Sequence, residues 1–261
     1  SKLRKSDLLI SGGGSLLQDI TSNKTIPYYL GIIVMAKLIR IPVFFCAQGV
    51  GPITKKFNQK LVALVLNKVE LLTVRDKNSK NLLQKLGVRK EIKVTADLVF
   101  SLTAAKSKQV KMILEKEKID FSLPTLAVSV RAWEDNSYLD QLAIILNDLT
   151  AKENIQILLI PLKYPKDQQV SSMLQKKINN PVQMITGNYS PKDLIGIIAN
   201  CDLMLGVRLH ALIFAAVAEI PVAGISYDQK VDSFLEQLGL EAITDINNFN
   251  QHLAYQRLIN S

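Results

Sequence analysis

The chain has 261 residues, of which 48% are hydrophobic, and a formal net charge of +9. This composition supports packed cores and excludes disordered, fibrous and collagen-like proteins. A chain of this length forms one large domain or two of ordinary size. Its longest apolar helix candidate, residues 28–39, is interrupted by Lys37, so no transmembrane helix is expected. Aromatic residues make up 6% and do not alternate with basic ones, which argues against a nucleic-acid partner.

The two cysteines indicate a reducing compartment. Cys46 and Cys201 each lie within an apolar, strand-like run, which suits buried thiols better than a disulfide framework. No Cys/His cluster has metal-ligand spacing, so no metal is expected. The chain starts at Ser1 and leads straight into a strand without a visible signal peptide. We therefore expect a cytoplasmic protein.

Short apolar runs alternate with helix-length amphipathic runs along the whole chain. Strands are predicted over residues 7–11, 43–47, 71–74, 92–94, 125–130, 155–160, 182–185, 203–205 and 222–225. Helices are predicted between them, for instance over residues 56–69, 79–86, 137–152, 191–199 and 228–238. Runs of Val, Ile and Leu separated by helices indicate parallel strands that are buried on both faces. The fold class is therefore α/β, with doubly wound sheets.

A Lys-rich segment over residues 100–123 marks the expected domain boundary. It divides the chain into two Rossmann-like domains, residues 1–120 and residues 121–261, which we expect to face a ligand cleft. The first domain looks short by a strand or two. We therefore expect that amino-terminal residues are missing from this sequence.

A glycine loop follows the first predicted strand. Gly12, Gly13 and Gly14 let the backbone approach a ligand and present N–H groups to it, and Gln18 and Asp19 can bind sugar hydroxyls. The loop lacks both the Gly-x-Gly-x-x-Gly dinucleotide pattern and the Gly-Lys-Ser/Thr ending of a P-loop. A tight strand-to-helix turn is the alternative interpretation.

The next two predicted strands also end in polar or glycine loops. Gln48 and Gly49 follow the second strand, so the two glycine loops are expected on one shared face. Arg75 and Asp76 follow the third strand. We expect these two either to pair with each other or to cap the next helix.

The second half places three cations after predicted strands. Arg131 follows the strand at 125–130, Arg208 follows the strand at 203–205, and Lys230 follows the last strand. Open α/β sheets bind ligands at the carboxyl ends of their strands, and a helix amino terminus adds attraction for an anion. His210, two residues after Arg208, adds a group that can move a proton. A surface arginine and a structural histidine are the alternative for this pair. His252, in a polar terminal helix, is expected to be a plain surface residue.

Six motifs in this order resemble the polysaccharide pyruvyltransferase family, closest to the CsaB type. They are SGGGSLLQD at 11–19, AQGVGP at 47–52, TVRD at 73–76, TAD at 95–97, GVRLHA at 206–211 and YDQKVDSF at 227–234. The motifs span nearly the whole chain. An opening strand and loop of the family's pattern is absent, so acceptor contacts made there are not visible in this sequence.

The resemblance implies a fold similar to the two-domain GT-B glycosyltransferases. It implies transfer of the enolpyruvyl unit of phosphoenolpyruvate to a sugar as a pyruvate ketal, with phosphoenolpyruvate as co-substrate and no cofactor. For the CsaB type the acceptor is N-acetylmannosamine of a secondary cell-wall polymer precursor, and the product supports S-layer protein anchoring. Whether the acceptor glycan is lipid-diphosphate-linked stays open. An enzyme that acts on membrane-held precursors and associates peripherally with the inner membrane face would have a reason for its positive charge. Improved solubility is nearly as good an explanation of that charge.

The resemblance also assigns roles to residues. Donor-binding residues map onto Arg131, Arg208, His210 and Lys230, and Arg is well shaped for carboxylate and phosphate groups. His210 is the expected general acid, Arg208 and Lys230 act with it in catalysis, and Lys230 stabilises the departing phosphate. The acceptor is expected at Gly12, Gly13, Gly14, Gln18, Asp19, Gln48 and Gly49. Asp19 or Asp97 is a candidate general base.

Two other functions fit parts of this pattern. A GT-B-fold glycosyltransferase with a nucleotide-sugar donor would use the same loops, with Glu236 as the carboxylate for the ribose. A non-catalytic protein that binds cell-wall precursors is the other alternative, although such a protein would not need the proton donor at His210.

Overall fold

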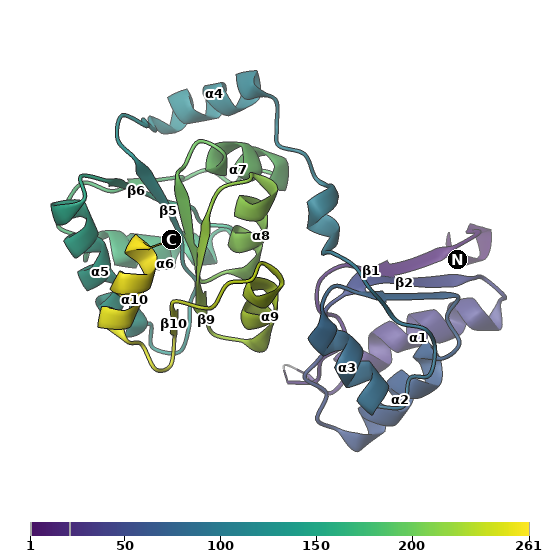
Figure 1. Ribbon diagram of the computed structural model, residues 1–261. Helices are drawn as coiled ribbons and strands as arrows, with labels where there is room; N and C mark the ends of the chain where they lie inside the picture. Colours follow the sequence, from purple (N-terminus) through teal and green to yellow (C-terminus); the bar gives the residue numbers. More distant parts are fainter. Residues whose placement is uncertain (1, 21, 261) are drawn as a thin grey trace. The chain divides into compact units, whose positions relative to one another are not determined.

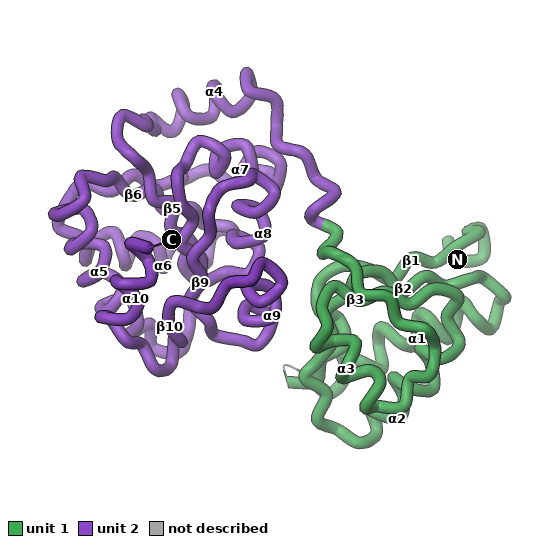
Figure 2. Tube along the Cα trace, viewed as in Figure 1, with its two compact units in different colours: residues 1–98 green, residues 99–261 purple. Residues whose placement is uncertain are grey.

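The computed structural model describes residues 2–20 and 22–260 (Figure 1). The chain forms two compact units that meet between Leu98 and Val99 (Figure 2). This boundary lies earlier than the division after residue 120 that we expected. The Lys-rich segment is not a linker: it lies within the second unit, and its middle part forms a helix, α4 (Ser107–Glu117). Its apolar side chains Val110 and Ile113 are buried in the core of the second unit, which leaves the charges on the outer face.

The first unit has a parallel sheet with the strand order β1-β2-β3-β4. The strands are β1 (Leu9–Gly12), β2 (Val43–Gln48), β3 (Leu71–Val74) and β4 (Lys93–Val94). The helices are α1 (Thr25–Leu38), α2 (Lys56–Leu66) and α3 (Lys77–Lys85). Short 3-10 helices span Lys2–Lys5 and Leu98–Ser101. Right-handed crossovers that all step in one direction place their helices on one face, and Figure 1 shows α1, α2 and α3 on the same side of this sheet.

The second unit has a six-stranded parallel sheet with the order β10-β9-β8-β5-β6-β7. Its strands are β5 (Thr125–Ser129), β6 (Gln156–Leu159), β7 (Gln183–Met184), β8 (Leu203–Gly206), β9 (Val222–Ser226) and β10 (Thr244–Asp245). Besides α4, its helices are α5 (Tyr138–Lys152), α6 (Lys166–Gln175), α7 (Pro191–Ile198), α8 (Leu209–Val217), α9 (Gln229–Gln237) and α10 (Gln251–Ile259).

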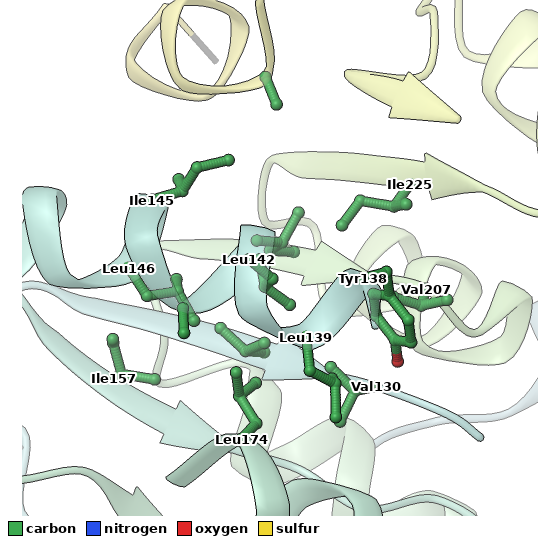
Figure 3. Packing of buried hydrophobic residues seen from close by; sticks show 14 of the residues in the cluster. Val130, Tyr138, Leu139, Leu142, Ile145, Leu146, Ile157, Leu174, Val207 and Ile225 are labelled. Atoms are coloured by element: carbon green, nitrogen blue, oxygen red, sulfur yellow. The ribbon is translucent and has the colours of Figure 1, made fainter. Parts of the chain in front are cut away.

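Helices cover both faces of this second sheet. Every residue of β5 and β9 is buried, as the continuous apolar runs predicted. On one face α5 lays Leu139 and Leu142 against strand residues such as Ile157 and Ile225 (Figure 3). On the other face α4, α7, α8 and α9 build a second apolar layer. The α/β fold with parallel sheets is therefore confirmed, but only the second sheet is doubly wound, because the first carries its helices on one face. No helix in the described part of the chain is long and apolar enough to span a bilayer.

The strand order of the second unit reverses between β5 and β8. From β5 the chain steps outward through β6 and β7, then returns to the other side of β5 and continues through β8, β9 and β10. Such a reversal opens a crevice beyond the carboxyl ends of the two central strands, where open α/β sheets bind their ligands.

Candidate functional site

Two arginines follow the two strands that flank this reversal. Ser129, the last residue of β5, is the register partner of Gly206, the last residue of β8. Arg131 comes two residues after Ser129, and Arg208 comes two residues after Gly206. The fold therefore brings these two cations to the same edge of the sheet. The opening of α8 directly after Arg208 adds its N–H groups and dipole to the attraction for an anion.

Arg208 is held by a buried carboxylate that the sequence analysis missed. Its Nε and Nη2 both reach the carboxylate of Asp167 in the first turn of α6. Asp167 is fully buried and also accepts a hydrogen bond of 2.8 Å from the Lys163 backbone N–H, whereas the Arg208 side chain is 22% exposed. A guanidinium carries five N–H donors, more than one carboxylate occupies, so donors remain for a ligand.

Tyr138 connects the surroundings of the two arginines. Its hydroxyl donates to the Arg131 carbonyl at 2.6 Å and accepts from the Arg131 N–H at 3.3 Å. Burial raises the pKa of Tyr138, the charges of Arg131 and Arg208 lower it, and the charge of Asp167 raises it. The side chain is 3% exposed. It stays a neutral hydroxyl that fixes the backbone after β5.

Arg131 and Lys230 share one aromatic ring. The Arg131 Cζ lies 4.1 Å from the ring centroid of Tyr227, and the Lys230 Nζ lies 5.0 Å from the same centroid. Trp133 packs against Tyr227 in a tilted arrangement, with 5.3 Å between the ring centroids. Lys230 also pairs with Asp228 at 3.1 Å. Cation–π contacts lower the cost of placing two positive charges close together. The structure therefore brings Arg131 and Lys230 to the same aromatic ring.

His210 is exposed in the first turn of α8. Its ring makes an edge contact with Phe214, at 6.4 Å between centroids. The helix holds the ring two residues beyond Arg208, at the carboxyl end of β8. A proton donor must reach the reacting atom, so exposure at the strand end suits the role expected of His210. His252 is exposed on α10 and lies 2.8 Å from the Gln256 amide nitrogen.

The two glycine loops of the first unit are hydrogen-bonded to each other. The Gly13 N–H donates to the Cys46 carbonyl at 3.3 Å, and the Gly49 N–H donates to the Gly14 carbonyl at 2.9 Å. Gly13 and Gly14 have φ angles of 80° and 65°, a region that favours glycine. The two loops therefore lie side by side, as expected. The positive φ angles of Gly13 and Gly14 also agree with the alternative interpretation of this loop as a tight turn.

Arg75 is a buried support beneath these loops. It is 6% exposed and donates to the Ser15 hydroxyl at 3.1 Å and to Asp97 at 3.0 Å. A Cβ on Gly49 would lie 2.6 Å from the Arg75 Nη2, so glycine leaves room for this guanidinium. Asp76 caps α3 by accepting from the Ser79 N–H and also lies 3.7 Å from the Arg75 Nε, so both alternatives that we considered are present.

Three side chains predicted to meet the acceptor or its proton are instead occupied inside the first unit. Asp19 is 4% exposed and accepts from Thr54 and Asn58. Gln48 is fully buried; its amide nitrogen donates to the Ser11 carbonyl at 2.9 Å, while its Oε1 has no hydrogen-bond partner among the described residues. Asp97 is held by Arg75. This geometry gives all three structural roles and leaves the general base unassigned. Of the other residues predicted to bind the acceptor, Gln18 is half-buried, and Gly12, Gly13, Gly14 and Gly49 belong to the two glycine loops.

Asp19 makes stability depend on pH. Burial raises its pKa, but hydrogen bonds from Thr54, Asn58 and Lys55 outweigh that effect and lower the pKa to about 2, from 3.8. Because the folded pKa is the lower one, the stabilisation is complete above about pH 4 and is lost as the pH falls towards 2. Asp19→Asn should cost about 2–4 kcal/mol at pH 7, since one amide oxygen cannot replace two carboxylate oxygens.

Urea unfolding followed by circular dichroism checks this prediction, with Asp7→Asn on the exposed surface as the matched control. The difference between wild type and Asp19→Asn should shrink between about pH 4 and pH 2. An equal difference at both ends of that range would contradict the assigned role.

The two units, each built on a parallel sheet, define a GT-B-like α/β protein. The chain belongs to the polysaccharide pyruvyl transferase family, whose sequence profile matches residues 1–229. It is 22% identical over 269 residues to the amylovoran biosynthesis protein AmsJ of Erwinia amylovora, and the match covers 95% of this chain and 63% of AmsJ. The chain thus spans less than two thirds of that relative.

Solved structures show the same fold. The UDP-GlcNAc 2-epimerase of Methanocaldococcus jannaschii superposes with a TM-score of 0.67 at 14% identity, over 99% of this chain and 72% of the epimerase. The S. aureus MnaA–UDP co-structure gives a TM-score of 0.64 at 14% identity, over 99% of this chain and 68% of MnaA. At this identity the likeness establishes the fold alone.

Proposed function

We propose that this protein transfers the enolpyruvyl unit of phosphoenolpyruvate to a sugar of a polysaccharide precursor and forms a pyruvate ketal. The observation that carries the proposal is the set of cations at the strand reversal of the second unit: Arg208 anchored by Asp167, with Arg131 and Lys230 over one ring. Phosphoenolpyruvate carries a carboxylate and a phosphate, and separate fixed cations can bind both. Family membership supports the same donor-transfer chemistry.

The proposed reaction forms two C–O bonds at the donor carbon and breaks its bond to phosphate. His210 gives a proton to the methylene carbon of the donor while a sugar hydroxyl bonds to the adjacent carbon and loses its own proton. A second hydroxyl then bonds to that carbon and loses its proton, and phosphate leaves with the electrons of the broken C–O bond. Of the two hydroxyl protons, one restores His210 and the other goes to the departing phosphate. Lys230 stabilises the charge on the departing phosphate. Arg208, oriented by Asp167, binds the donor and holds it in place for attack.

The identity of the acceptor sugar and its binding site form a second, more specific proposal. We propose that it binds at the glycine loops of the first unit, and that it is the N-acetylmannosamine of a secondary cell-wall polymer precursor, in support of S-layer anchoring, as for the CsaB type. The similarity to AmsJ, a protein of amylovoran biosynthesis, supports a polysaccharide acceptor more generally. Incubation with phosphoenolpyruvate and a panel of acceptor sugars tests both levels. Phosphate release that depends on an added acceptor supports the reaction. If no acceptor in the panel leads to phosphate release, the proposed reaction is overturned.

Nucleotide-sugar glycosyl transfer is the second candidate, favoured by one observation. The same fold appears in MnaA with UDP and in Anabaena HepE with UDP-glucose. The carboxylate expected to bind a ribose is wrongly placed for this role, however. Glu236 lies near the carboxyl end of α9, so the length of the helix, about 1.5 Å per residue, separates it from the carboxyl end of β9. Release of UDP from a UDP-sugar would establish this candidate.

A further inference from the structure

We propose that the outer faces of α1 and α2 form a surface that binds an anionic lipid bilayer. We call this surface the α1–α2 face; it is defined by Tyr28, Met35, Leu38, Phe57 and Leu64 with the lysines around them. It belongs to the first unit and shares no residue with the donor site. The inference does not depend on the proposed reaction.

The net positive charge of the protein comes from the first unit. Residues 1–98 contain 17 Lys and Arg but 6 Asp and Glu, whereas residues 99–261 contain 15 and 17. Residues 20–69, which include both helices, contain no Asp or Glu at all. Even spacing for solubility would not produce such a segment. A continuous stretch without carboxylates is suited to a surface that faces many negative charges.

Helix α1 is apolar on its outer side as well as its inner side. Ile26, Leu30 and Ile33 are buried against the sheet. On the opposite side Tyr28 is 65%, Met35 53% and Leu38 78% exposed. A helix that is apolar all round is normally covered on both sides, so a partner of low polarity is expected on its outer side.

Helix α2 presents apolar and basic side chains together. Phe57 is 70% and Leu64 60% exposed, and Lys56, Lys60 and Lys68 are exposed beside them. The two helices pack against each other on the same side of the sheet (Figure 1). Their outer faces therefore combine large apolar side chains with exposed lysines; Glu70, two residues after Lys68, pairs with Lys37 of α1.

A bilayer with anionic headgroups suits this combination better than other partners do. Apolar side chains enter the headgroup boundary while lysines remain at the phosphates, and each lysine near such a surface strengthens binding. A second copy of the protein docked through the same face would bring two strongly positive surfaces together. A nucleic acid would neutralise the lysines but leave Leu38 and Met35 in water.

Sedimentation with vesicles tests the proposal. Wild-type protein should bind vesicles of phosphatidylglycerol and phosphatidylcholine and leave pure phosphatidylcholine vesicles in the supernatant. Lys56→Gln/Lys60→Gln/Lys68→Gln should weaken binding by roughly fivefold per lysine. Met35→Gln/Leu38→Gln/Phe57→Gln should weaken it tenfold or more at unchanged charge, because the apolar contribution is lost.

Matched controls come from exposed side chains of the second unit. Lys108→Gln/Lys111→Gln/Lys176→Gln removes the same charge, and Met112→Gln/Ile144→Gln/Met173→Gln removes similar apolar surface. Both should bind as wild type, and circular dichroism verifies that all variants fold. Equal binding by the α1–α2 variants and their controls would overturn the proposal. Absence of wild-type binding to the anionic vesicles would also overturn it. If, in addition, the apolar substitutions dissociated a dimer, the face would be an interface between two copies of the protein instead.

Discussion

His210→Ala is expected to lower kcat for pyruvyl transfer by about 10²–10⁴-fold, while phosphoenolpyruvate binds nearly as tightly as to wild type. The expectation follows from the position of the exposed ring in the first turn of α8, beside the cations but outside the Arg208–Asp167 pair. Loss of a proton donor affects the transition state far more than the bound ground state.

Initial rates of phosphate release and calorimetric titration with phosphoenolpyruvate measure the two effects separately. His252→Ala is the matched control, because the second histidine is exposed on α10 and lies outside the site. The control should retain wild-type kcat. A His210→Ala variant with wild-type turnover would show that His210 is not the general acid.

Asp167→Ala is expected to cost about 3–5 kcal/mol of the free energy of unfolding, because it leaves the partly buried Arg208 guanidinium without its counter-charge. The same change should weaken donor binding, since Arg208 is no longer oriented. Arg208→Ala should be similarly destabilising, because it strands a fully buried carboxylate. The two effects should be strongly non-additive in the double variant.

Urea unfolding of the two single variants and the double variant measures this coupling. Asp148→Ala is the matched control: it breaks the exposed pair with Lys152, at 3.0 Å, and should cost less than about 1 kcal/mol. A loss for Asp167→Ala no larger than that for Asp148→Ala would mean that the buried pair does not organise the site.

The sheet architecture was predictable because buried parallel strands leave a clear pattern. Continuous Val, Ile and Leu runs such as those of β5 and β9 have few other structural interpretations. The unit boundary was not predictable from charge. The lysines of α4 lie on the solvent side of a helix whose other side packs into the core, and local composition does not distinguish that case from a linker.

The candidate site was predictable where it depends on strand order and not where it depends on side-chain partners. Arg131, Arg208 and His210 follow strands, and the sheet topology alone brings such positions to one edge. Asp167 was not predicted, because nothing in the local sequence marks it as the partner of Arg208, which lies 41 residues away. Asp19 and Gln48 looked like ligands because the sequence does not reveal that Thr54, Asn58 and Ser11 already bind them.

The most direct test of the central claim is the melting temperature of the protein with phosphoenolpyruvate and, separately, with UDP-sugars. A ligand of the folded state stabilises it by about 2.7 kcal/mol at a hundredfold excess over Kd. We predict a rise with phosphoenolpyruvate that disappears in Arg208→Ala, measured against the melting temperature of that variant without ligand. A rise with UDP-sugars and none with phosphoenolpyruvate would contradict the assignment of the site to an enolpyruvyl donor.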